Sequence, residues 1–176
     1  MENANPVAWR ICHPNPKGNG CAIEIALVAA YCREEGYLRV RMANQHRADA
    51  VQGSVSPVYG FDWPKAVCFR LSVVDVAQFL AVLMFSQESI ADGKGLFKRT
   101  DGHKTVVQFH HQQEPRPCYC LNVSQNDAEG NGEIRRAFFM FGLMESFALR
   151  EILRRALVPM AFGIPTDWRR YGDDHE

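Results

Sequence analysis

Apolar and polar residues alternate along most of the first half of the chain, which is the pattern of β-strands with one buried face. In the stretch 37–42, the residues that face one way are all apolar, whereas those on the other face are Tyr37, Arg39 and Arg41. The same alternation predicts three further strands. The four predicted strands of this half are 7–12, 21–29, 37–42 and 66–71.

A helical repeat follows the fourth of these strands. Apolar residues recur at helical spacing from 73 to 85, where Ser72 is a favourable N-cap and Asp75 complements the dipole of the first turn. The second half of the chain then repeats the same order, with a tight hairpin predicted at Asp101-Gly102. Its predicted strands are 95–99, 103–111, 116–123 and 133–140, and its closing helix is 141–158. The pattern is therefore four strands and a helix, twice over, which makes the fold α+β.

Two features depart from this simple order. The connection 44–62 is unusually long and rich in Gly, Ser and Pro, which is typical of a functional or mobile loop. The closing helix is apolar on more than one side, which exceeds what one sheet can cover and favours oligomerisation. Its predicted stacked face consists of Met144, Ala148, Ile152, Ala156 and Met160. Among the aromatic residues, Phe69 and Phe97 are expected in the core.

Composition places the chain among ordinary globular proteins. Of its 176 residues, 47% are hydrophobic and 23% are charged, and the length suits one domain, predicted at 1–164 with a tail at 165–176. The formal net charge is zero, which is unfavourable for a protein that binds phosphate groups. The charges are unevenly distributed, however, because 37–47 contains three Arg residues and no acid, and 93–104 contains four basic residues and one acid. Such basic stripes remain compatible with phosphate binding.

The sequence shows no sign of secretion or of a membrane span. The N-terminus lacks a basic region followed by an apolar run, and no stretch approaches about 18 apolar residues. We therefore expect a cytoplasmic protein, associated with the nucleoid if it is bacterial, with no membrane partner. The six cysteines are expected to be reduced residues of the core.

The most specific segment of the chain is Gly-Phe-Asp-Trp-Pro-Lys at 60–65, which leads into Phe-Arg-Leu-Ser-Val at 69–73. This order resembles the Whirly family of plant single-stranded DNA-binding proteins, which have a Tyr-Asp-Trp segment, a basic residue and a Phe-Ser-Leu-Ser-Val strand entering the first helix. The resemblance covers 9–163 and includes the turn at 35–38 and the Leu-Asn-Val-Ser segment at 121–124. The chain is also similar to kinetoplastid guide-RNA-binding proteins and, more distantly, to PC4-type coactivators.

The resemblance implies two four-stranded antiparallel sheets packed across each other, each followed by a helix. It also implies a homo-oligomer, expected to be a tetramer with the helices at its centre, and single-stranded DNA or RNA bound along the sheet edges between subunits. The family's Lys-Gly-Lys-Ala-Ala-Leu signature is only partly present, because Lys17 and Gly18 match but one residue is added and the second lysine is missing. This departure is unfavourable for tight DNA affinity and for very large assemblies.

The expected mechanism combines attraction of the phosphate backbone with stacking of bases on aromatic rings, which tolerates any base. Neither catalysis nor a cofactor is expected. For Trp63 a place in the core is an equally good interpretation, as is a solvated position for each basic residue. The candidate stacking residues are Trp9, Tyr37, Tyr59, Phe61 and Trp63. The candidate phosphate contacts are Lys17, Arg39, Arg41, Lys65, Lys94, Lys98, Arg99 and Lys104.

Two alternatives stay open at this point. The first is a structural or protein-interaction module that has the fold but does not bind nucleic acid, which the neutral charge favours. The second is a metal-dependent enzyme that uses His and Cys residues of the second half. The residues concerned are His103, His110, His111, Cys118 and Cys120. Their spacing is not that of the usual structural zinc site, so we expect no metal here.

Overall fold

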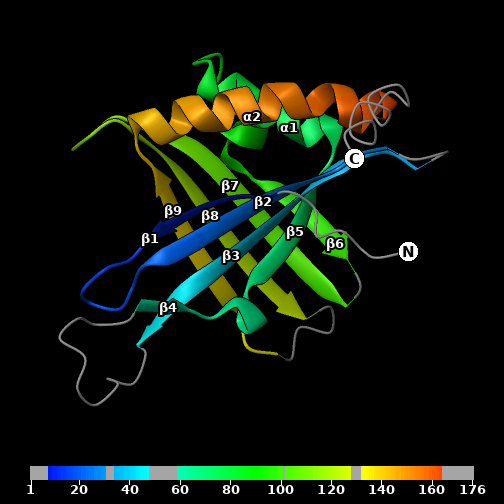
Figure 1. Ribbon diagram of the computed structural model, residues 1–176. Helices are drawn as coiled ribbons and strands as arrows, with labels where there is room; N and C mark the ends of the chain where they lie inside the picture. Colours follow the sequence, from blue (N-terminus) through cyan, green and yellow to red (C-terminus); the bar gives the residue numbers. More distant parts are fainter. Residues whose placement is uncertain (1–7, 31–33, 48–58, 101, 128–131, 164–176) are drawn as a thin grey trace, which may run out of the picture.

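The two halves of the chain form two β-sheets that cross each other, with both helices side by side over one end of the strands (Figure 1). The computed structural model describes residues 8–30, 34–47, 59–100, 102–127 and 132–163. The predicted tail and most of the predicted connection 44–62 lie outside the described residues. The predicted α+β fold, in which a helix follows each antiparallel sheet, is confirmed.

The first sheet has five strands where four were expected. They are β1 (Ala8–His13), β2 (Cys21–Val28), β3 (Tyr37–Arg47), β4 (Tyr59–Phe61) and β5 (Val67–Leu71). One edge of β3 pairs with β2, whereas β5 and β4 pair with successive parts of its other edge. The prediction that a connection begins at Asn44 was wrong, because β3 continues to Arg47 and pairs there with β4. A polar residue, Gln45, occupies the buried position in this part of β3, so hydrophobic alternation gives no signal.

The second sheet consists of four antiparallel strands in chain order. They are β6 (Leu96–Thr100), β7 (His103–Gln112), β8 (Cys118–Asp127) and β9 (Arg135–Phe141). The predicted hairpin is confirmed, because Thr100 pairs with His103 and Gly102 has a φ of +79°, a conformation that favours glycine. β8 extends beyond its predicted end at 123, because buried Gln125 donates hydrogen bonds to Thr105 Oγ1 and to the Cys68 carbonyl oxygen, each at 3.0 Å.

Helix α1 (Val73–Leu83) begins as predicted, with a capping box between Ser72 and Asp75. Helix α2 (Leu143–Phe162) continues past its predicted end at 158, through Pro159. Its last turn is held because the backbone N–H groups of Ala30 and Gly36 donate to the carbonyl oxygens of Pro159 and Met160, at 3.0 and 2.9 Å. In the described part of the chain, no helix has both the length and the apolar character needed to cross a membrane.

The buried face of α2 differs from the predicted one. It consists of Ser146, Leu149, Leu153, Ala156 and Met160, whereas Met144 and Ala148 are exposed. The prediction followed a strict spacing of four residues, which drifts about 40° around the helix at each step because a turn contains 3.6 residues. Only the last two predicted positions therefore lie on the core side.

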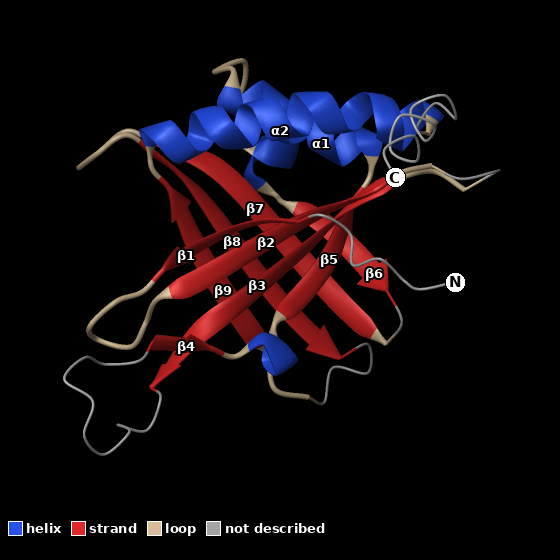
Figure 2. Cartoon of the chain, viewed as in Figure 1, coloured by secondary structure: helices blue, strands red, loops and turns tan. Residues whose placement is uncertain are grey.

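The core lies between the two sheets and beneath the helices (Figure 2). Its largest side chains include Phe69, Phe109 and Phe139, so the prediction for Phe69 is confirmed. The prediction for Phe97 was wrong, because its side chain is 79% exposed. Leu96 takes the core-facing position in β6, and successive side chains of a strand point to opposite faces, so Phe97 points outward.

Candidate nucleic-acid interface

The outer face of the first sheet carries a cluster of arginine and aromatic side chains. The register of the strands places Arg10, Glu24 and Arg41 side by side on β1, β2 and β3. Trp63, from the short 3-10 helix η1 (Trp63–Lys65), lies against both arginines, with its ring centroid 4.8 Å from Cζ of Arg10 and 5.2 Å from Cζ of Arg41. Arg41 Nη2 also donates a hydrogen bond to the Trp63 carbonyl oxygen at 3.1 Å.

Glu24 compensates the charge of this cluster. It is 5% exposed and accepts hydrogen bonds from Arg10 Nε at 3.2 Å and from Arg41 Nη1 at 3.5 Å. The hydrogen bond from Arg10 lowers the pKa of Glu24, which outweighs the opposing effect of burial and keeps the carboxylate ionised. Two of the predicted contact residues, Arg41 and Trp63, therefore lie together, but both already have partners within the sheet.

A hollow of about 250 Å³ lies where this face meets the second sheet. It brings together three of the predicted contact residues, Tyr37 from β3 and Lys98 and Arg99 from β6, with Arg70 from β5. The guanidinium of Arg70 stacks on the Tyr37 ring at 4.4 Å from its centroid, and Lys98 forms an ion pair with Asp75. Arg99 is exposed and lies opposite Lys104 in the β6–β7 hairpin. Basic side chains thus reach from one sheet to the other, although Glu35 and Asp75 line the same hollow.

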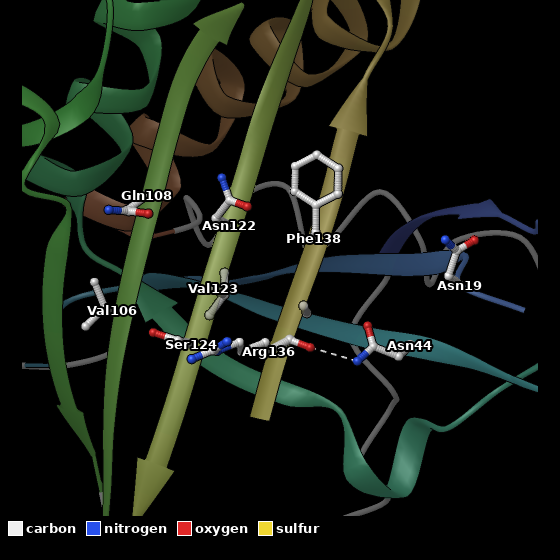
Figure 3. A pocket seen from close by; sticks show the side chains of 10 residues that line it. Asn19, Asn44, Val106, Gln108, Asn122, Val123, Ser124, Arg136 and Phe138 are labelled. Atoms are coloured by element: carbon white, nitrogen blue, oxygen red, sulfur yellow. Dashed lines mark hydrogen bonds between the residues drawn. The ribbon is translucent and has the colours of Figure 1, made fainter. Parts of the chain in front are cut away.

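The outer face of the second sheet has a different chemistry. Two rows of side chains cross it, and all of their members except Phe97 line a larger hollow of about 620 Å³ (Figure 3). One row is Phe97, Val106, Ser124 and Arg136, and the other is Gln108, Asn122 and Phe138. At the edge of the hollow, Asn44 Nδ2 donates a hydrogen bond to the Arg136 carbonyl oxygen at 2.7 Å, which joins β3 to β9.

The second face is open to solvent and contains no acidic residue among those lining its hollow. Phe97 and Phe138 are 79% and 46% exposed. The side chains of Gln108 and Asn122 form no hydrogen bond with any other residue that the structure describes. Sequence reasoning missed all four residues, although the alternation in β9, where Ala137 and Phe139 are buried, could have placed Phe138 outward.

Comparisons with known proteins identify the fold. No protein-family model matches the chain, and no curated protein matches its sequence. Among solved structures, WHY3 from Arabidopsis thaliana matches with a TM-score of 0.64 at 16% identity, covering 93% of this chain and 92% of that chain. The fold is Whirly-like.

Two further structures share this Whirly-like fold. WHY1 from Arabidopsis thaliana matches with a TM-score of 0.62 at 15% identity, covering 94% of this chain and 90% of that chain. The plant transcriptional regulator PBF-2 matches with a TM-score of 0.62 at 14% identity, covering 94% and 85%. The predicted resemblance is thereby confirmed at the level of the fold.

The remaining predicted contact residues are spread over the Whirly-like fold. Trp9 lies on the core-facing side of β1, on the opposite face from Arg41. Arg39 is half-buried on the outer face, and its Nε is buried without a hydrogen-bond partner among the described residues. Phe61 is half-buried in β4, and the side chain of Tyr59 lies outside the description.

Three lysines of the predicted set lie in or near loops. Lys17 is exposed in the β1–β2 hairpin, which Gln45 fastens by accepting hydrogen bonds from the backbone N–H groups of Asn15 and Gly20 at 2.7 and 3.1 Å. Lys65 is exposed and lies 3.6 Å from Asp62. Lys94 is exposed before β6. None of the three lines the hollows described above.

The cysteines partly depart from the predicted core positions. The five that the structure describes are all free thiols, but Cys12 and Cys68 are exposed on the outer face of the first sheet. Sγ of Cys118 lies 3.9 Å from Sγ of Cys120, and burial raises the pKa of Cys120 to about 11, which disfavours its thiolate. In the described part of the chain, no group of three or more His, Cys, Asp or Glu side chains is placed to hold a metal ion.

Proposed function

We propose that this chain binds single-stranded nucleic acid, DNA or RNA, largely without regard to sequence, and has no catalytic activity. The observation that carries the proposal is the outer face of the second sheet, where exposed Phe138 lines a hollow with no acidic residue among those described and exposed Phe97 lies opposite Val106 in the adjacent row. The Whirly-like fold supports it, since PBF-2, which shares the fold, is a transcriptional regulator.

The two rings supply stacking platforms for bases. A base stacked on an exposed aromatic side chain contributes about 1–3 kcal/mol, and every base has a face that can stack. Arg99 and Lys104 lie next to Phe97 on the same hairpin, where they neutralise phosphates of the strand. A duplex binds poorly to such a face because its bases are already stacked on one another.

We further propose that the chain acts as a homo-oligomer, a tetramer as the sequence resemblance implies. The support is an exposed apolar surface on and beside the two helices. It consists of Val74, Met84, Phe85, Leu143, Met144, Phe147, Val158 and Phe162. Exposed apolar residues gathered on two adjacent helices are typical of protein–protein contacts. Association through the helices leaves the outer faces of the sheets open in every subunit.

Fluorescence anisotropy with labelled oligo-dT, oligo-U and a duplex, at two salt concentrations, tests the proposal. Both single strands are expected to bind and the duplex to bind much more weakly. The double substitution Arg99→Ala with Lys104→Ala lowers the slope of log affinity against log salt by about 0.7 for each lost phosphate contact. Arg116→Ala is the matched control, because this exposed arginine lies in the loop at the opposite end of β7.

Failure to bind any single strand at about 10 µM in low salt would refute the proposal, since non-specific binders reach this range. A second candidate, a protein-interaction module, would then remain. It is favoured by the charge compensation of Arg10 and Arg41 by Glu24 and by the exposed apolar helix surface. An oligomer in light scattering that purifies free of nucleic acid and binds no oligonucleotide is the result expected for such a module.

A further inference from the structure

We propose that the outer face of the second sheet prefers adenine over the other bases, and that Gln108 and Asn122 confer this preference. The proposal rests on the proposed function and adds a base preference to it. The two carboxamides lie directly opposite each other on β7 and β8, and Asn122 lies opposite Phe138 on β9 (Figure 3). Two hydrogen-bonding groups and one stacking ring thus adjoin in a single row.

Both carboxamides are free to form hydrogen bonds with a ligand, as far as the described residues are concerned. No described residue accepts from or donates to either side chain, whereas buried Gln125 on the same sheet has two partners. Gly95 keeps the space beside Gln108 open, because a Cβ there would lie 2.9 Å from Cγ of Gln108 and 2.8 Å from the Val107 carbonyl oxygen. Gly95 also has a φ of +78°, which strains any other residue.

The residue types around the hollow select among the bases. Asn and Gln pair in bidentate fashion with adenine, because a carboxamide presents a donor and an acceptor side by side, matching N6 and N7. Guanine is matched by Arg or Lys and cytosine N4 by an acid. The lining includes no acidic residue, and its one arginine, Arg136, lies in the neighbouring row with Ser124. Unpaired bases can be read in this way because their edges are accessible.

The charged groups lie at the border of this face. Arg99 and Lys104 occupy the hairpin beyond Phe97, and Arg136 adjoins the edge at Asn44. A strand whose phosphates follow these cations brings its bases over the uncharged centre, where the carboxamides contact their edges. Only the few nucleotides over the hollow are read, so the preference is superimposed on otherwise sequence-tolerant binding.

The test uses labelled thymidine oligonucleotides that carry a central triplet of A, C, G or T. The wild-type chain is expected to bind the A triplet about tenfold more tightly than the C and T triplets, which is the discrimination of a good bidentate pair. Gln108→Met with Asn122→Leu keeps the size of both side chains and removes their hydrogen-bonding groups. This variant should bind all four oligonucleotides alike, with the affinity of the wild type for T.

Two control variants accompany the test. Gln113→Ala removes an exposed glutamine just beyond β7 and should retain the adenine preference. Phe138→Ala should weaken binding of all four oligonucleotides by a similar factor, because stacking tolerates any base. Circular dichroism of each variant checks that the sheets are intact.

The outcomes separate the inference from the function on which it rests. Absence of binding to all four oligonucleotides means that the proposed function has failed. Tight binding that differs less than twofold among the triplets overturns the adenine preference alone, as does a preference for G that depends on Arg136. An adenine preference that survives the double substitution overturns the assignment to Gln108 and Asn122.

Discussion

The outer faces of the two sheets differ in whether their side chains already have partners within the protein. On the first, the guanidinium groups of Arg10 and Arg41 both lie against the Trp63 ring, and both form ion pairs with Glu24. On the second, exposed Phe138 lies in one row with the carboxamides of Gln108 and Asn122, which have no partners among the described residues, and exposed Phe97 lies in the adjacent row. The face that is richer in arginine in the sequence is thus the one whose groups are already engaged.

This difference has an energetic consequence. A phosphate that binds Arg10 or Arg41 must compete with the ionised carboxylate of Glu24, which both arginines already contact. The net gain from binding a phosphate there is therefore small. A base that binds Gln108 or Asn122 breaks no hydrogen bond to another residue that the structure describes. Clusters of basic residues in a sequence therefore do not by themselves locate a binding surface.

The largest change in affinity is expected from substitutions on the outer face of the second sheet. Phe97→Ala with Phe138→Ala should lower affinity for oligo-dT by about tenfold or more per ring, because each stack contributes about 1–3 kcal/mol. Both rings are exposed, so the free energy of unfolding should change little. Anisotropy and urea unfolding measure the two quantities. A loss of stability without a loss of affinity would show that the rings serve packing and would remove the contrast between the faces.

A smaller change in affinity, this time an increase, is expected from a substitution on the outer face of the first sheet. Glu24→Gln removes the charge that compensates Arg10 and Arg41, so affinity for oligo-dT should rise severalfold at low salt. The free energy of unfolding at neutral pH should fall by about 1–3 kcal/mol, because charge-assisted hydrogen bonds are weakened. An unchanged affinity would mean that nucleic acid does not approach this face.

The carboxyl group of Glu24 also makes the stability of the wild-type chain depend on pH. Because the folded pKa of Glu24 lies below its ordinary value of 4.5, its contribution to stability is complete above pH 4.5 and is lost as the pH falls through the folded value. Urea unfolding of the wild type should therefore lose stability in this acid range more steeply than that of Glu24→Gln.

The smallest effect is expected for Trp63→Ala. Each contact between an arginine and the ring contributes about 0.5–1 kcal/mol at an exposed site, so stability should decrease by about 1–2 kcal/mol. Affinity for oligo-dT should change less than threefold, because the ring is already covered by Arg10 and Arg41. If Trp63→Ala lowered the affinity as much as Phe97→Ala with Phe138→Ala does, the stacking residues would lie on the first sheet.

The comparison also shows which parts of the site could be read from the sequence. The alternation in 37–42 correctly predicts that Tyr37, Arg39 and Arg41 share the outer face of β3. It gives no information on Glu24, which is far along the chain and meets Arg41 only through the pairing of β2 with β3. Phe97 was missed because an aromatic residue in a strand was expected in the core, although Leu96 already filled that position.

The sequence by itself determined the strands with regular alternation, the Ser72 cap and the Gly102 turn, because these depend on contacts within a few residues along the chain. Only the tertiary structure decided which surface is open. The row of Gln108, Asn122 and Phe138 exists because three strands pair in one register, and the engagement of Arg41 exists because β2 brings Glu24 beside it. Pairing between distant segments leaves no periodic signal in the chain, so the partners of a side chain become visible only once the sheets are assembled.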